Sequence, residues 1–249
     1  MMKQQSKLLL VNFIVHVATI FGIYYYWSEF IWLDFLIINL AIIFFAITVA
    51  ECFVHRYCTH MAYKLNKGME TFLIYCSTFT LHPPILVWAP NHITHHKYPD
   101  IDGDSHPASD GWKTWFWYDT YKNNMISSHT VKRLLKNKHY RIQYENFFII
   151  YVISIMTAMV ISPFYTLCIL LIPAVFTFHI AGIINVLCHT LKWGYRNFDT
   201  KDTSVNINIF PFSCSTLHNN HHKNPSSITT RVHWYEIDIG EYIIKMIRI

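Results

Sequence analysis

Four apolar stretches, each long enough to cross a lipid bilayer, restrict the fold of this chain more than any other feature. A helix needs roughly 20 apolar residues to cross the hydrocarbon core, and it must satisfy its backbone hydrogen bonds internally. The predicted spans are Leu8–Trp27, Phe30–Phe53, Asn146–Ile161 and Phe164–Leu187. Of the 249 residues 53% are hydrophobic and only 14% are charged. We therefore predict an all-α membrane protein with one domain, residues 1–249.

A fifth apolar stretch, Thr71–Val87, is interrupted by His82-Pro83-Pro84. If the histidine clusters described next share one metal site, they lie on one side of the membrane, which forbids a single crossing here. We therefore predict an interfacial or re-entrant helix over 71–87. Basic residues precede the first and third spans: Lys3, Lys7, Lys132, Arg133, Lys136, Lys138 and Arg141. The positive-inside rule makes this side, with both termini, cytoplasmic.

Eight of the sixteen histidines fall into three clusters, and a ninth follows an asparagine by one helical turn. The motifs are His55-x4-His60, His92-x2-His95-His96, His218-x2-His221-His222 and Asn185-x3-His189. Spacings of three and four put side chains on one helix face. The spacing of five between His55 and His60 is less suited, so we expect these two to straddle a helix end. Nine imidazoles exceed the roughly six ligands that one ion takes, which indicates two metals.

This ligand supply favours redox chemistry on an apolar substrate over hydrolysis. A hydrolytic zinc site usually has three protein ligands and a water, and the sequence has no HExxH motif. Unactivated C–H bonds offer nothing to acid–base side chains, so metal and dioxygen must supply the oxidant. Ligating imidazoles usually donate their second nitrogen to a carboxylate. The candidates for that contact are Glu51, Asp100, Asp102 and Asp104.

At these motifs the chain resembles the integral-membrane fatty acid desaturases, specifically the acyl-CoA Δ9 (stearoyl-CoA-desaturase-like) branch and its bacterial relatives. The resemblance runs from about Ala50 to Asp238. Besides the histidine motifs it rests on Trp88-Ala89, Asp100-x3-Asp104-x-His106, Gly194-x-Arg196, Ser204-x-Asn206, Pro225-Ser226 and Trp234-Tyr235-Glu236-Ile237-Asp238. The chain departs from the pattern at Cys214-Ser215, where Gly-Glu is usual, at Asn91, where aspartate is usual, and at Ser105, where proline is usual.

The resemblance implies a cytoplasmic di-iron cap on four membrane helices that forms a double bond in a fatty acyl chain, using dioxygen and two electrons. The implied iron ligands are His55, His60, His92, His95, His96, His189, His218, His221 and His222, with Asn185 binding through a water. No catalytic residue beyond the metal centre is expected. The acyl group could be carried by CoA, acyl carrier protein or lipid, in a bacterial inner membrane. Hydroxylation or acetylenation at the same centre, or a non-catalytic metal-binding or transport protein, are the alternatives.

Partners and peripheral residues are predicted more coarsely. The resemblance implies a separate electron carrier of ferredoxin, rubredoxin or cytochrome type. The basic run Lys132–Arg141 could bind that carrier, or it could reflect only the membrane topology and contact with anionic lipid. No nucleic-acid partner is expected. His106 is expected to support the metal ligands or contact a head group. The expected substrate entrance or interfacial aromatic belt comprises Trp88, Trp112, Trp115, Trp117 and Tyr118. His16 and His179 are expected to pack inside the spans or line a tunnel.

Overall fold

The computed structural model describes residues 2–116 and 127–249, so the predictions for Trp117 and Tyr118 lie outside the described residues. Within these ranges the chain is helical and has no β-strand, which confirms the all-α prediction. Three helices are long and apolar enough to cross a membrane: Gln4–Tyr25, Trp32–Thr59 and Pro163–Thr190. Two bent helix pairs could raise the number of spans to five. The predicted number of four lies within this range and stays a prediction.

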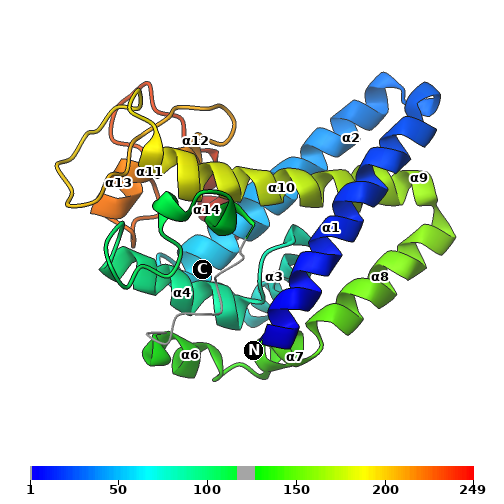
Figure 1. Cartoon of the computed structure of the whole chain (residues 1–249), viewed down its shortest axis with the longest axis horizontal. Helices are drawn as coiled ribbons and strands as arrows, with labels where there is room; N and C mark the ends of the chain where they lie inside the picture. Colours follow the sequence, from blue (N-terminus) through cyan, green and yellow to red (C-terminus); the bar gives the residue numbers. More distant parts are fainter. Residues whose placement is uncertain (1, 117–126) are drawn as a thin grey trace.

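The first two helices run in opposite directions and diverge from the short turn that joins them (Figure 1). Helix α1 (Met2–Tyr25) is joined through the short turn η1 (Trp27–Glu29) to α2 (Trp32–Ile42), which continues without a break into the π-helical segment η2 (Ile43–Thr59). The side chain of Asp34 caps the start of α2 by accepting the N–H of Ile31 at 2.9 Å. The predicted end of this span at Phe53 was too early, because the helix continues six residues further and carries His55.

The predicted break at His82-Pro83-Pro84 is present, but the apolar stretch 71–87 is not one helix. Helix α3 (Lys67–Cys76) and the turn η3 (Ser77–Thr80) end at Leu81, which has a left-handed φ of 59°. Helix α4 (Ile85–Lys97) then leaves at 82° to the preceding helix. Val87 therefore belongs to the helix that carries the second histidine cluster. The bent pair has the form of a re-entrant segment or of a broken span.

The second half of the chain supplies another bent pair and a second continuous apolar helix of 28 residues. The cap begins with η4 (Ala108–Asp110) and α5 (Trp112–Trp115), and α6 (Ser128–Leu134) follows. Helix α7 (Lys138–Glu145) meets α8 (Phe147–Ile161) at 74°, so the predicted third span is one arm of a bent pair. The next helix runs through α9 (Pro163–Thr166), η5 (Leu167–Leu171), α10 (Ile172–Gly182), η6 (Ile183–Leu187) and α11 (Cys188–Thr190).

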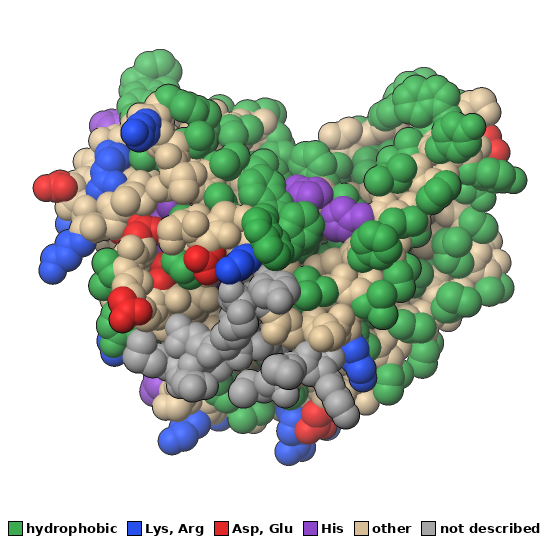
Figure 2. All heavy atoms as spheres, in the orientation of Figure 1, with side chains coloured by type: hydrophobic (Ala, Val, Ile, Leu, Met, Phe, Trp, Pro, Cys, Tyr) green, Lys and Arg blue, Asp and Glu red, His purple; other side chains and the backbone are tan. Residues whose placement is uncertain are grey.

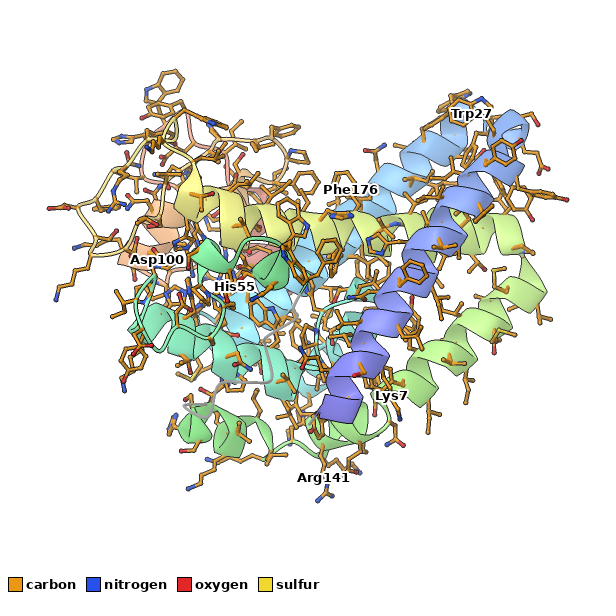
Figure 3. All side chains as sticks on the ribbon, in the orientation of Figure 1. Lys7, Trp27, His55, Asp100, Arg141 and Phe176 are labelled. Carbon is orange, nitrogen blue, oxygen red and sulfur yellow. The ribbon has the colours of Figure 1, made fainter. Side chains whose placement is uncertain are left out.

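The remaining helices complete a cap at one end of the long helices (Figure 1). They are α12 (Ser213–Thr216), α13 (His218–Lys223) and α14 (Ile239–Ile247). Figure 2 shows hydrophobic side chains covering the α1 and α2 side, while charged side chains gather over the cap and along the lower edge. Figure 3 places Lys7 and Arg141 at the lower end of the molecule and Trp27 at the opposite end. Opposite ends of α1 thus carry the basic and the aromatic residues.

Candidate metal centre

The fold brings the nine predicted histidines together into two adjacent groups. The first group is His55, His60, His92, His96 and His221. The second group is His95, His189, His218 and His222. In each group the nitrogen atoms available as ligands all lie within 4.8 Å of one another. Segments far apart in the sequence therefore converge on these two groups, and His95 also forms a third candidate group with Asp104 and His106.

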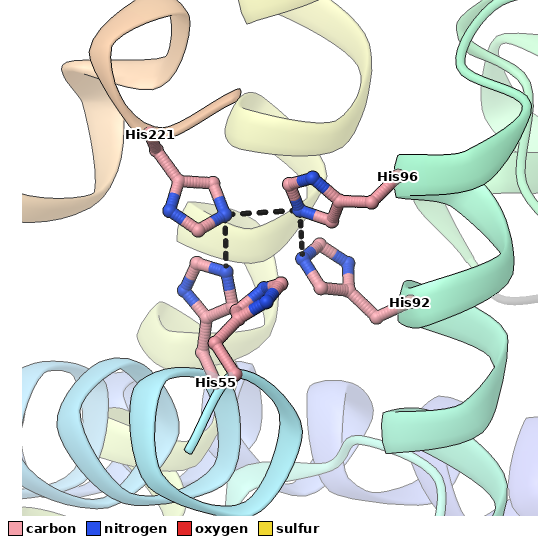
Figure 4. A group of neighbouring side chains, drawn as sticks. His55, His92, His96 and His221 are labelled. Atoms are coloured by element: carbon pink, nitrogen blue, oxygen red, sulfur yellow. Dashed lines mark hydrogen bonds between the residues drawn. The ribbon is translucent and has the colours of Figure 1, made fainter. Parts of the chain in front are cut away.

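Helices η2, α4 and α13 supply the first group (Figure 4). Nε2 of His221 lies 2.9 Å from Nε2 of His55 and 2.9 Å from Nε2 of His96. Nε2 of His96 in turn lies 3.1 Å from Nε2 of His92. His60 ends η2, where its N–H donates to the carbonyl of His55 at 3.2 Å. The hydrogen bonds of η2 join residues five apart, so a spacing of five places the rings of His55 and His60 in one group. The prediction from α-helical periodicity had rated this spacing as less suited.

Helices α4, α11 and α13 supply the second group. Nε2 of His218 lies 3.0 Å from Nε2 of His189 and 3.1 Å from Nε2 of His222. The rings of His95 and His222 are 5.1 Å apart. The rings of His96 and His222 stack at 4.5 Å across the boundary between the two groups. The two candidate sites are therefore in direct side-chain contact.

The contacts between these nitrogens fit a cation better than a set of hydrogen bonds. A neutral imidazole nitrogen carries either one proton or one lone pair. His189 and His222 point Nδ1 at carboxylates. As neutral rings that donate Nδ1–H, both would present a lone pair at Nε2 to His218, whose own Nε2 has at most one proton for the two of them. Burial lowers the pKa of His218 and of His221 well below the ordinary value, which favours the neutral form of both rings. Neutral, convergent lone pairs are the donor set that Fe, Zn, Cu or Ni takes.

Four carboxylates hold four of the rings by Nδ1. Glu51 accepts from His55, Asp104 from His95 and Asp100 from His189, each at 2.9 Å. The fourth, Asp202, lies 3.2 Å from Nδ1 of His222, and it was missed because nothing in its spacing marks it. Burial alone would raise the pKa of Asp100, but its contacts with His189 and Thr203 outweigh burial and lower it to about 2. These contacts fix the tautomers and the ring orientations.

The other predicted supporting residues have different surroundings. His106 is buried beside His95, with ring centroids 4.3 Å apart, and its Nδ1 lies 3.8 Å from Asp104. Asp102 is exposed on the loop that follows α4. Asn185 is buried, and its Nδ2 has no hydrogen-bond partner within the described residues. An unpaired buried amide is costly, so Asn185 is suited to a polar ligand that the chain does not provide.

Loops after the last long helix hold the third histidine cluster in place. Oδ1 of Asn219 accepts the N–H groups of Asn197 and Phe198 at 3.0 and 2.9 Å. Nδ2 of Asn206 donates to Oδ1 of Asn220 at 2.8 Å, and Nδ2 of Asn220 donates to Glu236 at 3.2 Å. The asparagines between the histidines therefore anchor α13 to neighbouring segments. This leaves the imidazoles free to point at the other helices.

A mainly apolar cavity of about 40 Å³ opens beside both groups. Its wall includes His55, His92, His218 and Asn185, and Trp88 lies in it stacked 4.7 Å from His92. Its apolar lining is Ala46, Ala50, Ile180, Ala181 and Ile184.

The tryptophans predicted at the substrate entrance are dispersed. Trp88 lines the cavity. Trp112 is 61% exposed. Trp115 lies against Gly182, where an added Cβ would come within 2.4 Å of the indole, and its Nε1 donates to Nδ1 of His179 at 3.1 Å. His179 also lies 3.2 Å from Nε2 of His16, so these two histidines join α1 to α10.

Comparison with known sequences agrees with this arrangement. The model of the family described as fatty acid desaturase matches residues 30–245, which include all nine histidines and the four carboxylates. The matched region runs from the start of α2 almost to the end of α14.

Several characterised plant proteins are similar to the chain. The icosanoyl-CoA 5-desaturase of Limnanthes douglasii is 31% identical over 90% of this chain and 64% of its own length. The Δ9 acyl-lipid desaturase 2 of Arabidopsis thaliana is 28% identical over 96% of this chain and 78% of its own length. The acyl-CoA C20 Δ5-desaturase of Anemone leveillei is 28% identical over 78% of this chain and 64% of its own length. The chain thus spans somewhat under two thirds of the length of two of these relatives.

Proposed function

This chain belongs to the fatty acid desaturase family, and from that premise we propose that it is an oxygen-dependent desaturase that forms a double bond in a fatty acyl chain. We propose that the two histidine groups each hold one iron ion, and that Asn185 contributes through a water. The observation that carries the proposal is the apolar cavity whose wall contains imidazoles of both groups. The mainly apolar surface of this small cavity suits a short hydrocarbon segment of a substrate better than a polar group.

The residues of the chain would bind, orient and exclude water. The alanine and isoleucine side chains of the cavity would contact a hydrocarbon segment and restrict its orientations. Glu51, Asp100, Asp104 and Asp202 hold Nδ1 of their histidines, which directs each Nε2 at an ion. When bound, iron together with dioxygen and two electrons supplies the oxidant that removes two hydrogen atoms. A separate carrier would deliver those electrons.

We propose a cytoplasmic orientation for the cap and for both ends of the chain. Lys7 and Arg141 lie at the end opposite Trp27, which agrees with the positive-inside rule. The relatives named above are plant proteins whose names include Δ5 and Δ9 activities and both CoA and lipid carriers. The Δ9 position, the bacterial type with its inner membrane, and the acyl carrier therefore stay predictions.

Lipid analysis of a host that lacks unsaturated fatty acids tests the proposal. Expression of the chain should restore growth and yield a monounsaturated acyl chain, with its double bond located by mass spectrometry. A product that retains one oxygen atom would instead identify a hydroxylase, and a triple bond an acetylenase. Purified protein that carries iron, receives electrons from a competent donor and consumes oxygen without yielding any of these products would overturn the proposal.

A further inference from the structure

Ser215 makes an unusual contact at the edge of the first group. Its Oγ donates at 3.0 Å to Oε2 of Glu51, the same oxygen that accepts Nδ1 of His55 at 2.9 Å. Both Ser215 and Glu51 are buried. The hydroxyl of residue 215 therefore lies directly against the carboxylate oxygen that orients a candidate metal ligand.

We propose that position 215 is a second place from which a carboxylate can orient His55, and that Glu51 and Ser215 form a positioning pair that holds one acid. The inference rests on the proposed metal site. A glutamate at 215 would extend two bonds beyond the present Oγ, which already touches Oε2 of Glu51. The carboxylate could then reach Nδ1 of His55 from α12 instead of from η2.

The buried guanidinium of Arg56 keeps these two segments in fixed relation. Its Nε donates to Oε1 of Glu51 at 2.8 Å, and one terminal nitrogen donates to the carbonyl of Cys214 at 2.8 Å. The other terminal nitrogen lies 3.1 Å from Asp238. Arg56 thus contacts both the segment that carries Glu51 and the segment that carries Ser215. A carboxylate at position 215 would therefore still lie near the positive charge of Arg56.

Charge explains why one member of the pair is neutral. Two carboxylates in contact inside a buried site cannot both ionise without a large penalty. Ser215 instead is neutral and donates a hydrogen bond to Oε2 of Glu51.

An exchange of the two side chains tests the pair in the full-length protein. The variants are Glu51→Ser, Ser215→Glu and the exchange Glu51→Ser/Ser215→Glu, with Glu51→Ser/Ser215→Asp as a shorter alternative should the exchange fail to fold. The readouts are iron bound per protein after titration with Fe(II), and the thermal midpoint of the metal-free protein. The matched control is Glu51→Ser/Ser213→Glu, because Ser213 is also buried on α12 and its hydroxyl has no partner in the described part of the chain.

Glu51→Ser should weaken iron binding about 10- to 100-fold, the usual effect of losing a carboxylate behind a metal-bound histidine. The exchange should recover most of that affinity, the control should not, and Ser215→Glu alone should lower the thermal midpoint. The proposal is overturned if the folded exchange, or its aspartate version, binds iron no better than Glu51→Ser. Metal-loaded wild-type protein that forms no unsaturated product would overturn the proposed function and leave this comparison readable.

Discussion

The partner of each imidazole nitrogen decides which side of the ring faces an ion. His55, His95 and His189 all turn Nδ1 to a carboxylate and leave Nε2 among their neighbours. His222 likewise turns Nδ1 to a carboxylate, that of Asp202. The other neighbours of His222 come from distant segments of the chain. Such contacts set the tautomer and raise the basicity of the ligating nitrogen. Conservative changes in these carboxylates should therefore act on metal binding before they act on folding.

Asp202→Asn should weaken metal binding at the second group by about 10- to 100-fold, because asparagine keeps the shape but removes the charge that polarises His222. Titration of the metal-free protein with Fe(II) measures this effect. Asp199→Asn, an exposed acid in the same loop, is the control and should bind like wild type. Equal affinities for the two variants would mean that Asp202 does not support the site.

His222→Ala should abolish desaturation while the protein still inserts into the membrane. The change removes one of four nitrogens of the second group, and the apolar helices that carry insertion are untouched. Membrane fractionation and product analysis measure the two properties separately. Full turnover by this variant would exclude His222 from the centre.

The histidines could be identified from the sequence because they recur at helical spacings, and three of the four carboxylates because they lie close to those clusters. Asp202 has no such signal. It lies 20 residues before His222, in a loop shaped by Arg196, which donates to the carbonyls of Thr200, Asp202 and Ser204. A contact that depends on how a loop folds back leaves no periodic trace in one sequence.

Among the helices, η2 shows how local geometry changes the meaning of a spacing. Residues five apart diverge on an α-helix, but the i+5 hydrogen bonding of η2 brings His55 and His60 together. Hydropathy located this helix correctly, but the predicted span ended at Phe53. The polar residues that follow face the metal centre, and they lower the hydropathy as residues beyond a helix end do. The break before α4 was predictable, since the consecutive prolines Pro83 and Pro84 remove two neighbouring backbone donors. The angle of 82° was not, because packing sets it.

Ala181→Leu should block the substrate cavity between η2 and α10 without removing the metals. Overfilling a packed space typically costs about 1–3 kcal/mol, which here would oppose entry of the acyl chain. Activity should fall roughly 5- to 150-fold by that range. Iron content should stay at the wild-type level.

Ala18→Leu is the control, since Ala18 is exposed on α1. If both leucine variants turned over at the wild-type rate, the acyl chain would have to bind outside this cavity.

At the scale of the whole molecule, the sequence predicted that the distant histidine motifs meet. It could not show how their histidines are divided between the two groups. The histidines of the second cluster were predicted to share one helix face, yet α4 gives His92 and His96 to the first group and His95 to the second. Likewise α13 gives His221 to the first group and His218 and His222 to the second. The division depends on the relative rotation of the helices, which no single segment encodes.

The orientation of the chain can be tested by labelling introduced cysteines in intact cells. Arg141→Cys should react with a membrane-impermeant maleimide only after the membrane is opened, and Trp27→Cys should react from outside. Five of the six native cysteines are buried, so the background is low. The opposite labelling pattern would invert the proposed topology.

The two histidine groups take ligands from the same helices, and this affects how they bind metal ions. An ion in the first group orders α4 and α13, and those same helices carry three of the four nitrogens of the second group. The second ion then binds to an already ordered site, and this lowers its entropic cost. Iron should accordingly enter with a Hill coefficient above one, so that at half saturation the population consists mainly of empty and fully loaded molecules.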